Sequence, residues 1–378
     1  MASLVIVGSG LGAYLLAKEW RKYDSVSSLT IVTRSMGHYY SKPQLSTALA
    51  KGQSADALVM QSAEAMEAQL SATVITETEV TAVDTQRQYI YFGDQSLEYS
   101  QLVLAVGAEP IALNLTGAAS DGVVSINQWE DYRRFRYWLE GKKHIAILGS
   151  GLVGCEFMND LLIGGRQVSV VSTDSTPLAR LLPAALGEEF RRVMHEMGVD
   201  WYFGAGATAL QQEKTATIVK LRDGRCIQAD GVLSAVGLRV NVSLAKQAGL
   251  RVNQGIVVDG CMRTSHPNVF ALGDCAEIEG RLWQYVAPLL QSARALAKTL
   301  AGESTKVSYP LMPIMIKTTR CPLVVLPPVQ SEEGRWYLEG KGADWVARFC
   351  NGASQLRGFA LMGDGLKERA ALLKEMSA

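Results

Sequence analysis

The sequence predicts an α/β protein with two dinucleotide-binding domains and a small third domain. Two stretches, Leu4–Ala13 and Ile145–Gly154, each run from a short apolar strand through a glycine-rich turn into a helix. That order is the fingerprint of a Rossmann-like nucleotide site, where the pyrophosphate faces a helix N-terminus. A third stretch, Val269–Asp274, places an acid at the carboxyl end of a buried strand, where open α/β sheets bind ligands. One glycine loop is weak evidence, but the internal repeat implies two bound dinucleotides.

Length and charge narrow the class of protein. A chain of 378 residues exceeds the roughly 250 to 300 residues at which single cores stop growing, so several domains are expected. The 37 basic and 37 acidic residues balance, which argues against a nucleic-acid partner. No apolar run approaches the ~18 residues of a membrane span, and no signal pattern precedes the first strand. We therefore expect a soluble, cytoplasmic protein without membrane insertion.

The six cysteines form no motif. The shortest spacing between two of them separates Cys261 from Cys275, so neither Cys-x-x-Cys nor Cys-x-x-x-x-Cys occurs. This spacing excludes a local redox disulfide and a rubredoxin-like or zinc-ribbon site within the chain. The four histidines show no metal-ligand spacing either, and no metal is expected.

The first glycine loop follows the apolar strand Leu4–Val7, a run of the kind that fills a parallel strand buried on both faces. Gly8 makes the turn and Gly10 lets the backbone approach the pyrophosphate. Ala13 takes the position of the third glycine and opens a helix to Arg21. A bare glycine turn is the alternative interpretation.

The second strand, Leu29–Thr33, departs from the usual pattern. An acid normally follows this strand and binds the adenosine ribose, but here Arg34 and Ser35 follow. Either Arg34 or Ser35 meets the ribose or a phosphate, or that contact is weaker. The sequence leaves these possibilities open.

Several elements should connect the two loops. We expect strand material at Thr73–Val83, a hairpin at Gln86–Tyr99, a short strand and glycine turn at Leu102–Pro110, and a helix at Asn127–Leu139. The last helix has an aromatic face, and its arginines should lie on a solvated face.

The second glycine loop leads into a helix at Cys155–Leu162, and the next strand is Val168–Val171. Asp174 follows that strand. An acid there binds the 2′-hydroxyl of NAD, whereas NADP requires a basic group, so Asp174 favours NADH. The segment Gly231–Asn241 repeats the pattern of Leu102–Pro110 and should return the chain to the first domain.

The last third should complete the first domain and form the third. A helix should run from the Trp283 region to about Leu300, with Pro288 in its first turn. Beyond Ser304 we expect a small α/β domain with these strands and a closing helix: Met315–Thr318, Leu323–Leu326, Arg335–Leu338, Val346–Cys350, Leu356–Leu361 and Gly365–Lys374.

Thr264–Glu277 resembles the second flavin-binding segment of flavoproteins with two dinucleotide-binding domains, and His38–Ser46 resembles the Lys/Arg-Pro-x-Leu-Ser segment of rubredoxin and ferredoxin reductases. The whole chain resembles the rubredoxin-NAD(+) reductases, FAD-dependent pyridine nucleotide oxidoreductases close to the flavorubredoxin reductases. The following segments carry the match: Gly8–Ala13, Tyr40–Ser46, Gly149–Asp160, Thr264–Glu277, Tyr285–Pro288 and Lys317–Val325. The helix at Gly154–Asp160 favours the type that serves alkane oxidation.

The resemblance implies a glutathione-reductase-like architecture without the redox disulfide. The FAD-binding domain would comprise residues 1–110 and 242–308, the NAD-binding domain 111–241 and the C-terminal domain 309–378. Implied FAD contacts are Gly8, Ser9, Gly10, Leu11, Gly12, Ala13, Arg34, Ser35, Lys42, Pro43, Val80, Ala105, Gly107, Glu156, Gly273, Asp274, Val286 and Lys317. Implied NAD contacts are Gly149, Gly151, Leu152, Val153, Gly154, Asp174 and Gly237.

Two charged residues are candidates for catalysis. The resemblance places Lys42 beside the isoalloxazine, where a cation favours the anionic reduced flavin; a surface lysine is the alternative. Glu156 should lie in the first turn of its helix among apolar neighbours. It would reach the flavin and nicotinamide, with pairing to Lys42 as a hypothesis and a helix-dipole partner as the alternative. Lys317 would approach the flavin or the acceptor, unless it is simply solvated.

The implied reaction takes a hydride from NADH onto FAD and passes single electrons to rubredoxin or a similar one-electron carrier. The downstream enzyme would be an alkane hydroxylase or similar oxygenase. The alternatives are a ferredoxin or flavorubredoxin reductase and an NADH-responsive flavin redox sensor. A thiol-dependent reductase would need a reactive cysteine, whereas Cys155 and Cys275 are expected to be buried small hydrophobes. Monomer and dimer both remain possible.

Overall fold

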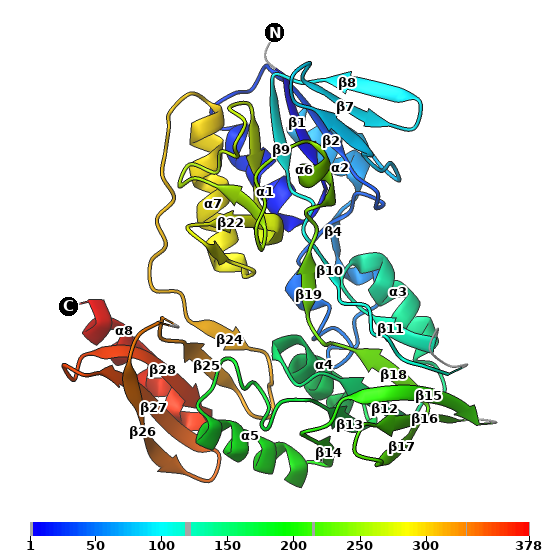
Figure 1. The fold of residues 1–378 in the computed structure, drawn as a ribbon, viewed down its shortest axis with the longest axis vertical. Helices are drawn as coiled ribbons and strands as arrows, with labels where there is room; N and C mark the ends of the chain where they lie inside the picture. The colour runs from blue at the N-terminus through cyan, green and yellow to red at the C-terminus, as the bar shows by residue number, and fades with distance from the viewer. Residues whose placement is uncertain (1–2, 118–121, 214–215, 330, 378) are drawn as a thin grey trace. The chain divides into compact units, whose positions relative to one another are not determined.

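The computed structural model describes residues 3–117, 122–213, 216–329 and 331–377. The chain forms two compact units (Figure 1). The first unit comprises Met1–Lys42, Asp56–Glu109 and Leu238–Pro310, and the second comprises Pro43–Ala55, Pro110–Gly237 and Leu311–Ala378. The second unit thus combines the parts predicted to bind NAD and to form the C-terminal domain. The predicted boundaries of three domains stay a prediction.

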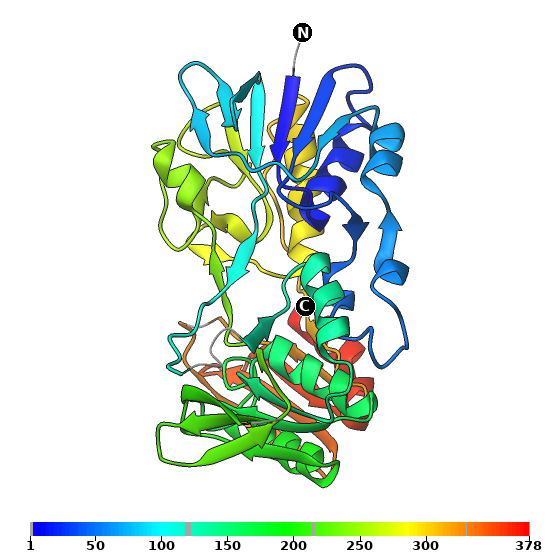
Figure 2. The same ribbon diagram turned by 90° about the vertical axis from the view of Figure 1, so that its right-hand side faces the viewer.

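A parallel sheet of five strands organises the first unit. Its order is β21 (Val269–Ala271), β9 (Gln101–Leu104), β1 (Ser3–Val7), β2 (Ser28–Val32) and β5 (Thr73–Ile75). The apolar run in β1 is buried because helices cover parallel sheets on both faces. Helix α1 (Leu11–Trp20) packs against α7 (Val286–Leu300), as Figure 2 shows. The predicted strands at the first glycine loop and at Val269 are confirmed.

The remaining elements of the first unit surround that sheet. The predicted hairpin is confirmed as β7 (Tyr89–Phe92) and β8 (Gln95–Glu98), joined by β6 (Ala82–Asp84). The strand material predicted at Thr73–Val83 is confirmed at its two ends, in β5 and β6, and is interrupted between them, where Glu77 adopts a positive φ of 50°. Smaller elements are β3 (Tyr39–Tyr40), β4 (Val59–Gln61), α2 (Ala63–Leu70), β10 (Ala108–Pro110), β19 (Leu238–Val240), α6 (Ser243–Gln247), β20 (Ile256–Val258), β22 (Ala276–Ile278) and β23 (Arg281–Leu282).

The second unit contains a parallel sheet of the same design. Its order is β11 (Val123–Ser125), β18 (Gly231–Ser234), β12 (His144–Leu148), β13 (Gln167–Val171) and β14 (Val199–Tyr202). Strand β12, which precedes the second glycine loop, lies between β13 and β18, just as β1 lies between β2 and β9 in the first unit. Strand β12 therefore corresponds to β1. The helices are α3 (Trp129–Trp138), α4 (Leu152–Ile163) and α5 (Ala184–Glu196).

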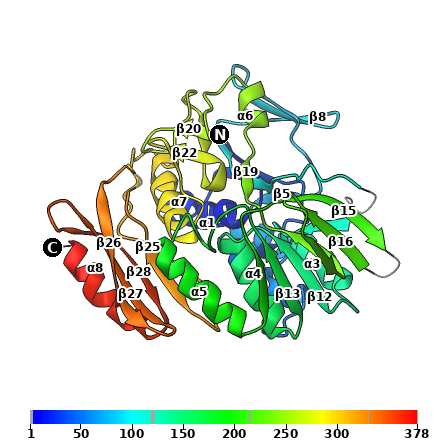
Figure 3. The same ribbon diagram turned by 60° about the horizontal axis from the view of Figure 1, so that its bottom comes forward.

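Two antiparallel sheets complete the second unit. One contains β15 (Ala207–Glu213), β16 (Ala216–Leu221) and β17 (Cys226–Ala229). The other, visible in Figure 3, has the order β24 (Ile314–Ile316), β25 (Leu323–Leu326), β28 (Leu356–Met362), β27 (Asp344–Asn351) and β26 (Gly334–Lys341). All five predicted C-terminal strands are confirmed, four of them with shifted ends. The predicted closing helix is wrong at its start, because Gly363–Glu368 is a 3-10 helix and α8 runs over Arg369–Ser377.

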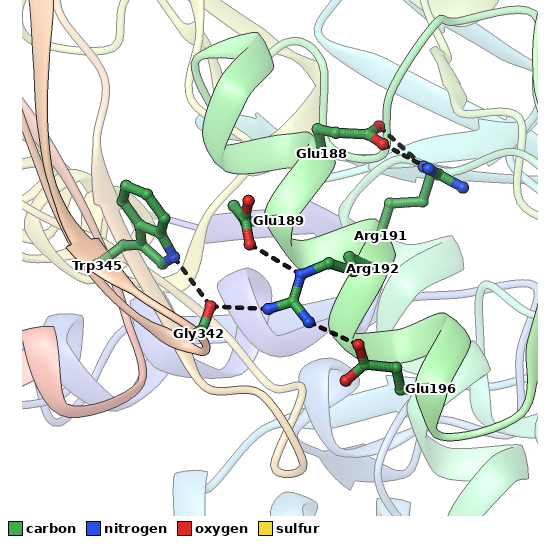
Figure 4. Close-up of polar contacts among 7 residues, drawn as sticks. All are labelled: Glu188, Glu189, Arg191, Arg192, Glu196, Gly342 and Trp345. Atoms are coloured by element: carbon green, nitrogen blue, oxygen red, sulfur yellow. Dashed lines mark hydrogen bonds and ion pairs between the residues drawn. The ribbon is translucent and has the colours of Figure 1, made fainter.

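Arg192 of helix α5 contacts the C-terminal sheet. Arg192 donates to the carbonyl of Gly342, in the turn between β26 and β27, over 3.1 Å (Figure 4). Glu189 and Glu196 on the same helix hold the guanidinium at 3.1 and 2.6 Å. The Nε1 of Trp345 donates to the same carbonyl over 3.0 Å.

The segment Pro43–Ala55 lies between two stretches of the first unit in the sequence but belongs to the second unit. The carboxylate of Asp160 accepts the backbone N–H of Leu49 over 3.2 Å and of Ala50 over 2.8 Å. The indole N–H of Trp129 donates to the carbonyl of Ala55 over 2.7 Å. These bonds attach the segment to α3 and α4, a contact that the sequence did not predict.

No helix in the described part of the chain is long and apolar enough to cross a bilayer. Within the same residues, no group of three or more His, Cys, Asp or Glu side chains is placed to hold a metal ion.

Candidate functional site

The first glycine loop has the shape of a dinucleotide cradle. Gly8 has a φ of 109°, and a Cβ there would lie 2.3 Å from the carbonyl oxygen of Ala105, so no other residue fits. A Cβ on Gly10 would meet no atom within 4 Å, which leaves open space beside the loop. Helix α1 begins at Leu11, two residues earlier than predicted, so its N-terminus faces that space. The residues present therefore fit the pyrophosphate of FAD.

The second glycine loop repeats this geometry. Gly149 has a φ of 108°, and a Cβ there would lie 2.4 Å from the carbonyl oxygen of Ala235. A Cβ on Gly154 would lie 2.1 Å from the carbonyl oxygen of Gly149, whereas one on Gly151 would meet open space. Leu152 and Val153 form the first turn of α4, and the loop fits a second dinucleotide.

Other predicted flavin contacts follow the ends of strands in the first unit. Gly273 and Asp274 form a 3-10 turn directly after β21 and Leu272. Lys42 lies 3.9 Å from Asp274, measured from Nζ to Oδ2, and both side chains are partly exposed. The remaining predicted contacts are placed as follows: Ala105 and Gly107 between β9 and β10, Val80 between β5 and β6, and Val286 at the start of α7.

At the end of β2, the structure supplies a carboxylate from elsewhere in the chain. Arg34 forms an ion pair with Glu109, with Nη2 and Oε1 2.7 Å apart. The hydroxyls of Ser9, Thr33 and Ser35 lie within 2.9 to 3.0 Å of one another. No sequence motif marks Glu109, so its place beside Arg34 could not be predicted.

Glu156 is the centre of a buried polar cluster in the second unit. Its side chain is 2 % exposed. Its Oε2 accepts from the Nζ of Lys317 and from the hydroxyl of Ser46, each over 2.6 Å. Its Oε1 accepts the backbone N–H of Lys317 over 3.1 Å. Lys317 also donates to the carbonyl of Pro43 over 2.7 Å.

This cluster corrects two interpretations of the sequence. The structure pairs Glu156 with Lys317, and the hypothesised pairing of Glu156 with Lys42 stays a prediction. Helix α4 begins at Leu152, which puts Glu156 in its second turn, beyond the first turn where the helix dipole acts. Lys317 is not a solvated lysine, because its ammonium group is bonded within the cluster. Sequence reasoning missed Ser46, although it lies in the segment that resembles the flavin reductases.

The predicted NAD contacts lie at the carboxyl ends of strands in the second unit. Asp174 follows β13, and its backbone N–H donates to the hydroxyl of Ser172 over 3.2 Å. Its side chain is partly exposed and can accept from a ribose. Gly237, with a φ of 119°, lies between β18 and β19.

The two cysteines nearest to the cofactor motifs are not reactive thiols. Cys155 and Cys275 are fully buried. Burial raises the pKa of Cys155 well above its usual range and that of Cys275 to about 11. Since the thiolate is the nucleophilic form, both behave as small hydrophobic residues, as expected from the sequence.

Comparison with known proteins adds family evidence to this geometry. Residues 2–296 match the family model described as pyridine nucleotide-disulphide oxidoreductase, and residues 306–376 match the one described as rubredoxin binding C-terminal domain. The chain is 44 % identical to the rubredoxin-NAD(+) reductase of Alcanivorax borkumensis, covering 100 % of this chain and 99 % of that protein. It is 34 % identical to the nitric oxide reductase FlRd-NAD(+) reductase of Aeromonas hydrophila, covering 99 % and 96 %.

Among solved structures, the covalent complex of putidaredoxin reductase and putidaredoxin has a TM-score of 0.89 to this chain. The sequence identity is 24 %, and the match covers 100 % of this chain and 93 % of that one. At this identity the likeness shows the fold alone.

Proposed function

Because the chain belongs to the pyridine nucleotide-disulphide oxidoreductase family, we propose that it is an FAD-dependent enzyme that carries electrons from NADH to rubredoxin. The observation that carries the proposal is the full-length similarity to a rubredoxin-NAD(+) reductase, together with the match of residues 306–376 to a rubredoxin-binding domain. The two glycine cradles supply the physical requirement, which is a place for each dinucleotide.

Bound FAD supplies the chemistry that side chains lack, namely hydride acceptance and the release of single electrons. The first glycine loop binds its pyrophosphate through backbone N–H groups, and Asp274 binds the ribityl chain. Lys42, held 3.9 Å from Asp274, places a positive charge near the isoalloxazine. The cluster of Glu156, Lys317 and Ser46 presents a fixed charge pair whose bonds also hold the segment that begins at Pro43.

The nucleotide specificity follows from Asp174. A carboxylate at this position accepts from the 2′-hydroxyl of NADH and repels the 2′-phosphate of NADPH. We therefore expect a higher kcat/KM with NADH than with NADPH. Replacing Asp174 by Ala should reduce that ratio mainly by raising the KM for NADH.

Two finer features are also part of the proposal. The greater identity to the rubredoxin-NAD(+) reductase than to the FlRd-NAD(+) reductase favours rubredoxin as the carrier, and an alkane hydroxylase or similar oxygenase as its downstream partner. All six cysteines are free thiols, which fits a reducing compartment such as the cytoplasm.

Anaerobic stopped-flow spectroscopy with the FAD-loaded protein tests the function. NADH should bleach the flavin, and subsequent mixing with rubredoxin should restore its absorbance while two rubredoxins are reduced per NADH. Ferredoxin and flavorubredoxin, tested at the same concentration, should be reduced more slowly. Faster reduction of ferredoxin or flavorubredoxin would establish one of the alternative reductases. A flavin that NADH does not bleach would refute the proposal.

A further inference from the structure

The first nucleotide site lacks the acid that its strand pattern calls for. In the dinucleotide fingerprint, a carboxylate after the second strand binds the ribose hydroxyls. Here β2 ends at Val32 and is followed by Thr33, Arg34 and Ser35. A carboxylate nevertheless reaches this place, because Arg34 forms an ion pair with Glu109 over 2.7 Å.

The order of strands shows where this ion pair lies. Strand β1 is hydrogen-bonded to β9 on one side and to β2 on the other, and all three are parallel. Arg34 follows the carboxyl end of β2, and Glu109 follows the carboxyl end of β9 after the turn at Gly107. The ion pair therefore joins the two strands that flank β1, at the edge where β1 enters the loop of Gly8. That edge is where an open α/β sheet binds its dinucleotide.

The hydroxyl groups beside the pair are already engaged. Ser9, Thr33 and Ser35 contact one another over 2.9 to 3.0 Å. The hydroxyl of Ser35 also accepts from the backbone N–H of Gly37 over 3.4 Å. A ribose that bonded to Ser35 would have to break this set of bonds, so Ser35 is the weaker candidate.

The carboxylate of Glu109 is oriented so that it can accept hydrogen bonds from the two hydroxyls of a ribose. Its Oε1 forms the ion pair with Nη2 of Arg34 over 2.7 Å and accepts the side-chain N–H of Asn241 over 3.4 Å. These contacts orient the carboxylate, and no residue in the described part of the chain bonds to Oε2, which can therefore accept from a ligand. The guanidinium neutralises the carboxylate, which would otherwise repel the pyrophosphate, and it retains further N–H donors.

The exposure of the pair allows the cofactor to enter. The side chains of Arg34 and Glu109 are 49 % and 37 % exposed. Exposed ion pairs contribute little to stability, so this one can open and close at small cost.

We propose that Glu109, oriented by Arg34 and Asn241, is the acid that binds the adenosine ribose of FAD in place of the acid missing after β2. This inference rests on the proposed binding of FAD. It assigns a binding role to a residue that is 75 positions away in sequence from Arg34.

The test measures the release of FAD from the purified holoprotein. On dilution, free flavin regains fluorescence, and the dependence on concentration gives the Kd. Glu109→Gln keeps the shape of the side chain but removes its charge, and should weaken FAD binding by about tenfold or more. Glu19→Gln is the matched control, because Glu19 is also ion-paired in the first unit, with Lys22 and Arg294 on helical surfaces. Its Kd should equal that of the wild type.

An FAD analogue with 2′-deoxyadenosine identifies the contact. The wild type should bind the analogue several-fold more weakly than FAD, whereas Glu109→Gln should bind both alike, since the two changes remove one shared interaction. Equal binding of FAD by the wild type and Glu109→Gln, with loss of binding in Ser35→Ala, would overturn the inference and assign the ribose to Ser35. Wild-type protein that binds no FAD would refute the proposed function itself.

Discussion

The pair of the buried Glu156 and the partly exposed Lys317 shows how a charge is kept inside this protein. A carboxylate that is 2 % exposed has lost its hydration, and only good partners compensate for that loss. Here the ammonium of Lys317, the hydroxyl of Ser46 and a backbone N–H supply three bonds. Removal of the cation alone should therefore destabilise the folded protein more than removal of both charges.

We expect Lys317→Met to lower the free energy of unfolding by roughly 3 to 5 kcal/mol, since it leaves Glu156 buried and unpaired. The double variant Glu156→Gln/Lys317→Met should recover a large part of that loss. Lys298→Met is the control, because Lys298 pairs with Glu303 at the surface and should change stability by less than about 1 kcal/mol. Urea unfolding measures all three. A double variant no more stable than Lys317→Met would contradict the explanation.

Asp160 couples the stability of the protein to pH. Burial raises the pKa of Asp160 to about 6, although two backbone N–H groups and the cations Arg136 and Lys51 act in the opposite direction. A folded-state pKa above the unfolded value of 3.8 means that folding favours the protonated acid. Its stabilising contribution is therefore present at low pH and is lost as pH rises through about 6.

Comparison of the wild type with Asp160→Asn isolates this effect, because asparagine does not titrate. The stability of the wild type relative to the variant should be greater at pH 5 than at pH 8, by roughly 1.5 kcal/mol. The loss of one backbone acceptor in the variant adds an offset that does not depend on pH. A difference in unfolding free energy that stays constant between these two pH values would show that Asp160 does not titrate in this range.

At the scale of elements, the side chain of Arg192 links α5 to the turn between β26 and β27. Arg192 lies between Glu189 and Glu196 and reaches the carbonyl of Gly342, whereas Arg191 pairs with Glu188 on the same helix (Figure 4). The two arginines are neighbours of equal charge. They therefore form a matched pair for testing that contact.

Arg192→Ala should increase hydrogen exchange in the turn at Lys341–Trp345 by several-fold, because the turn loses the bond to its carbonyl. Arg191→Ala should leave exchange in that turn unchanged. Mass spectrometry of peptides from the labelled proteins measures both. Equal exchange in the two variants would show that the turn is held by its own hairpin.

For the molecule as a whole, electron transfer should not depend on thiols. Cys226 is exposed, whereas Cys155, Cys261, Cys275 and Cys321 are buried. Burial raises the pKa of Cys321 to about 12 and that of Cys275 to about 11. Few thiolates are thus available near the glycine loops.

Iodoacetamide at pH 8 should label Cys226 and leave the NADH-dependent reduction of rubredoxin unchanged. Peptide mass spectrometry identifies the labelled residue, and Cys226→Ser checks that this label has no effect. Inactivation in step with labelling of Cys155 or Cys275 would instead support a thiol-dependent reductase.

The sequence predicted those parts of the structure in which local chemistry and topology agree. Both glycine loops follow apolar strands, and their glycines are required by backbone contacts with Ala105 and Ala235. The partners of charged residues were not predictable in this way. Glu156 and Lys317 are 161 positions apart, and their pairing depends on how α4 meets the C-terminal sheet. The break within the strand material at Thr73–Val83 was not predictable, because a positive φ at Glu77 has no sequence signature comparable to glycine.

The crossings of the chain between the two units have a consequence for synthesis on the ribosome. Strand β9 pairs with β21 in the sheet, but β21 is synthesised only after the entire stretch from Pro110 to Gly237. A nascent chain therefore exposes an unfinished sheet edge while the intervening stretch emerges and folds, and such edges favour aggregation. Slow translation of that stretch would lengthen this exposure, so the yield of native protein becomes a matter of timing as well as of stability.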